Sequence, residues 1–102
     1  MEALRRELAD LRDELRRRLA PGAETLSSED AGVLLGRVLR AVEDLGPQAE
    51  GTRGQAWGVL IGRAGRDLEV ATGTTDPNLL RTALSHAEEL LSLAIADMNT
   101  PQ

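Results

Sequence analysis

His86 is the only histidine in the chain, and it is the first residue to examine for chemistry because imidazole can act as a base or bind a metal. It begins the local sequence His-Ala-Glu-Glu, in which Glu89 follows three residues later. Di-metal helical bundles use Glu-x-x-His motifs, but the residue three positions before His86 is Ala83. Ser85 is adjacent, yet neighbouring residues on a helix point roughly 100° apart and do not pair. These residues therefore predict neither a catalytic site nor a metal site.

Other reactive residue types are scarce. The 102 residues include no cysteine, and all twelve basic residues are arginine, which excludes thiol and lysine chemistry. A phosphate-binding loop with its lysine is missing. The acidic residues are plentiful, but none interrupts an apolar face in a way that indicates burial and a shifted pKa. We therefore predict that the protein is not an enzyme and has no cofactor.

The charge of the chain narrows the choice of partners. A formal net charge of −5 argues against general binding to nucleic acid or to an anionic membrane. The run of three arginines at residues 16–18 lies among acidic residues of the same segment, and it predicts a charged exterior. The start of the chain has no apolar stretch typical of a secretion signal, and no segment is apolar enough to span a bilayer. A cytoplasmic location is expected.

Glycines at intervals of four surround the only aromatic residue, Trp57. Gly54, Gly58 and Gly62 share one face of a helix and predict a shallow groove without side chains. Each glycine costs about 1 kcal/mol of helix propensity, which the close approach of another backbone would offset. The pair at residues 32 and 36 repeats the spacing, so the two stripes are expected to face each other.

Trp57 is interpreted as the anchor of the core, with an interface hot spot as the alternative. A third interpretation is a ligand cleft, in which an apolar molecule lies beside Trp57 and an arginine binds its acidic group. That cleft would comprise Gly54, Trp57, Gly58, Ile61, Gly62, Arg63 and Arg66. The two arginines have a simpler interpretation as surface ion pairs, Arg63 with Asp67 and Arg66 with Glu69.

The elements that must hold these residues are helices. Apolar spacing, prolines, glycines and capping residues predict helices at about 2–19, 28–45, 53–72 and 77–98. Asp76-Pro77 is the clearest boundary, with aspartate as N-cap and proline at the first helical position. Similar helix lengths and short connections favour an all-α, antiparallel four-helix bundle, in one domain over residues 1–102.

The first predicted helix, within residues 1–20, has a narrow apolar seam and is otherwise charged. Its leucines follow steps of four, three, four and four, which is a spacing of coiled-coil type. The seam consists of Leu4, Leu8, Leu11, Leu15 and Leu19. Such a helix either packs across the rest of the bundle or meets its own copy in a second subunit.

Two hypotheses for function follow from these patterns. The first is a non-catalytic helical interaction module, an adaptor or regulatory subunit that forms a homodimer through the Leu4–Leu19 seam or binds a helical partner protein. The second is a helical bundle that binds a small apolar or acidic ligand in the cleft at Gly54–Gly62. Neither hypothesis involves nucleic acid or a membrane.

Overall fold

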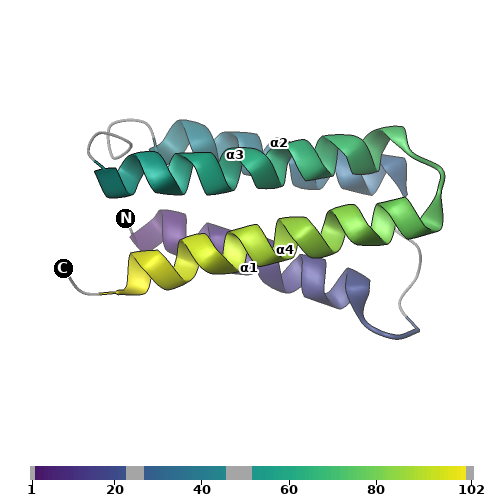
Figure 1. Cartoon of the computed structure of the whole chain (residues 1–102), viewed down its shortest axis with the longest axis horizontal. Helices are drawn as coiled ribbons and strands as arrows, with labels where there is room; N and C mark the ends of the chain where they lie inside the picture. The colour runs from purple at the N-terminus through teal and green to yellow at the C-terminus, as the bar shows by residue number, and fades with distance from the viewer. Residues whose placement is uncertain (1, 23–26, 46–51, 101–102) are drawn as a thin grey trace.

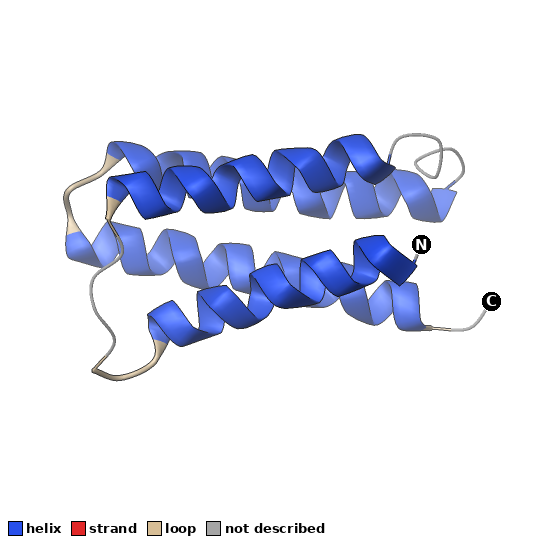
Figure 2. Cartoon of the chain, turned by 180° about the vertical axis from the view of Figure 1, so that it is seen from behind, coloured by secondary structure: helices blue, strands red, loops and turns tan. Residues whose placement is uncertain are grey.

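The computed structural model describes residues 2–22, 27–45 and 52–100, and all regular structure in these segments is helical (Figure 2). The helices are α1 (Glu2–Leu19), α2 (Ser28–Leu45), α3 (Thr52–Gly73) and α4 (Pro77–Asn99). They pack as a four-helix bundle, so the predicted fold class is confirmed. The predicted helix boundaries differ from the observed ones by no more than a single residue.

Local side-chain chemistry explains where the helices begin and end. The hydroxyl of Ser27 accepts a hydrogen bond of 3.1 Å from the amide of Asp30, which caps the start of α2. The carboxylate of Asp76 accepts one of 2.9 Å from the amide of Asn78 at the start of α4. After α1, Gly22 adopts a positive φ of 81°, a conformation that glycine reaches without steric cost. The chain is therefore divided where its sequence supplies caps and turns.

Each helix packs against the helices before and after it, and α1 closes the ring by packing on α4 (Figure 1). Neighbouring helices run in opposite directions. Arg5, near the start of α1, donates a hydrogen bond of 2.9 Å to Asn99, at the end of α4. Trp57, early in α3, likewise bonds to Asp97, late in α4. Consequently α1 lies diagonally opposite α3, and α2 diagonally opposite α4.

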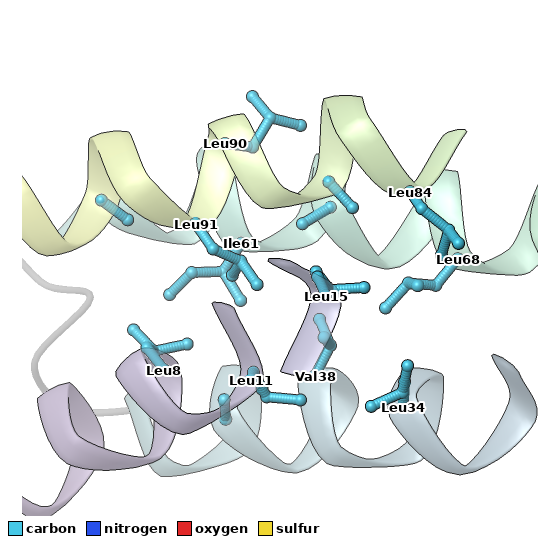
Figure 3. Close-up of a cluster of buried hydrophobic side chains, with 14 of the residues drawn as sticks. Leu8, Leu11, Leu15, Leu34, Val38, Ile61, Leu68, Leu84, Leu90 and Leu91 are labelled. Carbon is cyan, nitrogen blue, oxygen red and sulfur yellow. The ribbon is translucent and has the colours of Figure 1, made fainter. Parts of the chain in front are cut away.

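The core is aliphatic and receives side chains from all four helices. Leu15 of α1, Val38 of α2, Ile61 of α3 and Leu91 of α4 come together in the interior (Figure 3). Within the described segments, no polar or charged residue belongs to the buried class. The fold is therefore held by hydrophobic packing along the bundle axis.

Candidate functional site

The leucine seam of α1 lies inside the bundle. Leu8, Leu11 and Leu15 are completely buried and Leu4 almost so, while Leu19 packs partly buried at the end of the core. These side chains are enclosed by the chain's own helices, because the seam is the only apolar stripe that α1 can turn towards α2 and α4. The prediction that the seam is an exposed interface for a second copy is thereby corrected: a partner must use another surface.

The glycines of α3 divide between two directions. A Cβ atom on Gly58 would lie 3.6 Å from Leu45 of α2, whereas one on Gly62 would have nothing within 4 Å. The reason is that a helix has about 3.6 residues per turn, so a stripe at intervals of four drifts around it. Gly65, seven residues after Gly58, returns to the α2 side, where its Cβ would meet Val38 at 3.4 Å.

The glycines of α2 do not face α3. Gly32 and Gly36 are exposed, and a Cβ atom on either would meet nothing within 4 Å. The expectation of two facing glycine stripes is therefore wrong. The close approach of α3 to α2 is instead between glycines of α3 and large aliphatic side chains of α2, and the sequence analysis missed the contribution of Gly65.

A groove of about 230 Å³ lies between α2 and α3, open above Gly62. Its apolar wall comes from α2, and Leu39 in that wall is 56% exposed. We call this feature the α2/α3 groove; its lining is Leu35, Val38, Leu39, Val42, Gly62, Gly65, Arg66 and Glu69. It is an exposed apolar trough with one basic and one acidic side chain at its α3 edge.

Most of the predicted cleft residues lie elsewhere, so the cleft is not formed as predicted. Only Gly62 and Arg66 line the α2/α3 groove. Gly54, Trp57 and Ile61 are buried in the bundle, and Arg63 is exposed without lining the groove. The physical reason is again helix rotation, since Trp57 points towards α4 while the open glycine lies near α2.

Trp57 is a core residue that bridges two helices. Its side chain is 7% exposed, and its indole N–H donates a hydrogen bond of 2.5 Å to the carboxylate of Asp97. The interpretation as a core anchor fits this position. Asp97 was not singled out in the sequence, although a buried indole N–H always calls for an acceptor.

We expect Asp97→Ala to lower the free energy of unfolding by about 1–3 kcal/mol, because the buried indole N–H loses its acceptor. The matched control is Asp97→Asn, which keeps an oxygen acceptor and is expected to cost less than about 1 kcal/mol. Urea denaturation followed by circular dichroism measures both changes. Equal losses in the two variants would contradict the assigned role of the acceptor.

His86 pairs with an acid on the neighbouring helix. Its Nδ1 lies 2.6 Å from a carboxylate oxygen of Asp67, and the imidazole is largely exposed. In the described segments, Asp67 does not form the predicted pair with Arg63, nor Arg66 with Glu69, and Ser85 makes no hydrogen bond to His86. No group of three or more potential metal ligands occurs among these residues either. His86 therefore joins α3 to α4 at the surface.

The arginine run at residues 16–18 is used for contacts within the chain. Arg16 pairs with Glu88 of α4 at 2.7 Å, and Arg18 pairs with Asp30 of α2 at 3.6 Å. Both Arg17 and Arg18 also pair with Glu14. These arginines therefore hold the end of α1 to its neighbours, as parts of a mixed-charge surface.

Comparison with known proteins leaves the fold and the groove as the basis for function. The chain matches no protein-family model, no curated protein and no solved structure. In the described part of the chain, no helix combines the length and the apolar character needed to cross a membrane.

Proposed function

We propose that this protein is a non-catalytic helical interaction module, an adaptor or regulatory subunit, which binds a helix in the α2/α3 groove. The observation that carries the proposal is the groove itself, where the missing side chain of Gly62 leaves Leu39 and its neighbours open to solvent. Laying an apolar helix face into such a trough is a common mode of recognition. A cytoplasmic location is part of the same proposal.

The size of the groove favours a helix over a small molecule. Small-molecule pockets usually enclose about 300–1,000 Å³ and bury most of the ligand. The α2/α3 groove has about 230 Å³ and lies open along the surface. A row of side chains from a helix needs less enclosure, because the rest of that helix covers the groove.

A small acidic amphiphile is the second candidate occupant. Arg66 lines the groove beside Leu39, so it could bind a carboxylate while the apolar part lies on α2. This version replaces the predicted cleft beside Trp57 with a site one helix face away.

Site-specific photo-crosslinking in the native cells tests the proposal. A photo-reactive amino acid replaces Leu39 in the groove, and a matched variant carries it at Ser85, an exposed residue of α4 on the opposite side of the bundle. We expect adducts with a defined polypeptide, another protein or a second copy of this chain, only from position 39. Adducts of small mass at that position would favour the amphiphile, and equal labelling at both positions would refute the assignment of the groove.

A further inference from the structure

Four charged side chains on the outer surface of α2 and α3 have no ionic partner within the described chain. They are Glu29 and Arg40 of α2, and Arg66 and Glu69 of α3, all exposed. Arg66 and Glu69 are three residues apart on one helix, a spacing that permits a pair, yet the pair is not formed. The arginines at the end of α1 differ, since they pair with acids. Opposite charges that stay unpaired on one face indicate a contact outside the chain.

The order of residues on α3 is symmetric in charge. Gly62, Arg66, Glu69 and Gly73 follow steps of four, three and four, so they form one exposed stripe. Reversing the direction of the helix about the midpoint between Asp67 and Leu68 exchanges Arg66 with Glu69, and Gly62 with Gly73. An antiparallel copy of this stripe would therefore place opposite charges together and glycines opposite each other.

A second stripe on α2 has the same property. Glu29, Val33, Gly36 and Arg40 follow the same steps, and all are exposed. Reversal about the midpoint between Leu34 and Leu35 exchanges Glu29 with Arg40. It also places Val33, which is 61% exposed, opposite a glycine that leaves room for it.

The two midpoints lie at nearly the same height in the bundle. Gly65 of α3 lies beside Val38 and Leu35 of α2, while Gly58 lies beside Leu45. Because the helices are antiparallel, each step up α3 corresponds to a step down α2. The point between Asp67 and Leu68 is therefore level with the region of Leu34 and Leu35, so one two-fold axis serves both stripes.

We propose that the partner on this face is a second copy of the chain, packed face to face about a two-fold axis perpendicular to the helices. Arg66 of each copy pairs with Glu69 of the other, and Glu29 pairs with Arg40 at the flank. In a two-fold interface every such contact occurs twice. Leu39 and the α2/α3 groove are covered in the dimer, so this inference rests on the proposed function and names its partner.

Charge reversal with sedimentation velocity, over a range of protein concentrations, tests this arrangement. The wild-type chain is expected to sediment as a dimer. Arg66→Glu and Glu69→Arg each place like charges opposite each other twice, and each is expected to raise the dissociation constant at least about tenfold. The double variant R66E/E69R restores the pairs in reversed order, and its dissociation constant returns to within about threefold of wild type. Arg6→Glu is the matched control, since it makes the same charge change on the exposed side of α1.

Several outcomes would overturn the inference: a wild-type monomer at all concentrations, single reversals that behave like Arg6→Glu, or a double variant that stays dissociated. Far-ultraviolet circular dichroism on every variant separates loss of the dimer from loss of the fold. If the wild type is monomeric while position 39 crosslinks to a different protein, the dimer is excluded and the proposed interaction module stands. If position 39 also captures no polypeptide, both proposals fail.

Discussion

Replacing Leu11 by alanine is expected to lower the free energy of unfolding by about 2–5 kcal/mol. The side chain of Leu11 is completely buried in the core, where α1 meets the rest of the bundle. Its truncation removes apolar contact and leaves a cavity that the surrounding side chains fill only in part. Because domains of this size have about 5–15 kcal/mol of stability, such a loss takes a large share of the total. Urea denaturation of dilute protein, followed by circular dichroism, measures it.

The control for Leu11→Ala is the same substitution at Leu93, which is 53% exposed on α4. There we expect a change within about 0.5 kcal/mol, since little buried contact is lost. A small effect at both positions would mean that α1 is not part of the core. The comparison also shows why deletion of residues 1–20 is a poor test of an interface, as it would remove one wall of the core.

Gly65→Leu is expected to destabilise the bundle by about 1–3 kcal/mol or more. Even a Cβ atom at this position would lie 3.4 Å from Val38 and 4.0 Å from Leu35, so the further atoms of leucine have no room. Accommodating them requires α3 to move away from α2 or forces side chains out of their preferred rotamers. Thermal and urea unfolding of dilute protein both report this loss.

Gly62→Leu is the matched control, because it adds the same atoms one turn earlier. A Cβ atom on Gly62 meets nothing within 4 Å, and leucine is the better helix former by about 0.5–1 kcal/mol. We expect this variant to be more stable than the wild type while its side chain fills the α2/α3 groove. The prediction fails if both leucines destabilise the chain equally, since that would place Gly62 in a packed contact.

The fold could be predicted from the sequence because its punctuation is local. Proline, glycine and capping side chains act within a few residues, so Asp76-Pro77 indicates the start of α4 without knowledge of any other helix. The apolar seam of α1 likewise predicts which side of that helix is buried. What it does not specify is whether the covering surface comes from the same chain or from a copy, because both bury the same leucines.

The candidate site was predicted less well, since it depends on how the helices are rotated and aligned. The four-residue spacing of Gly54, Gly58 and Gly62 indicates a common face, but this face drifts away from α2 within two turns. The partners of Trp57 and His86 come from other helices, and their identity depends on register between helices. Such register follows from the packing of the whole core, which no single segment encodes.

The contact between Trp57 and Asp97 has a spectroscopic consequence. Trp57 is the only aromatic residue of the chain, so its fluorescence reports a single location, the junction of α3 with the end of α4. Helix α1 lies diagonally across the bundle from α3, so its detachment changes the helical signal before it changes the surroundings of the indole. A fluorescence transition that follows the circular dichroism transition would therefore measure, without any added label, how far the first helix separates ahead of the other three.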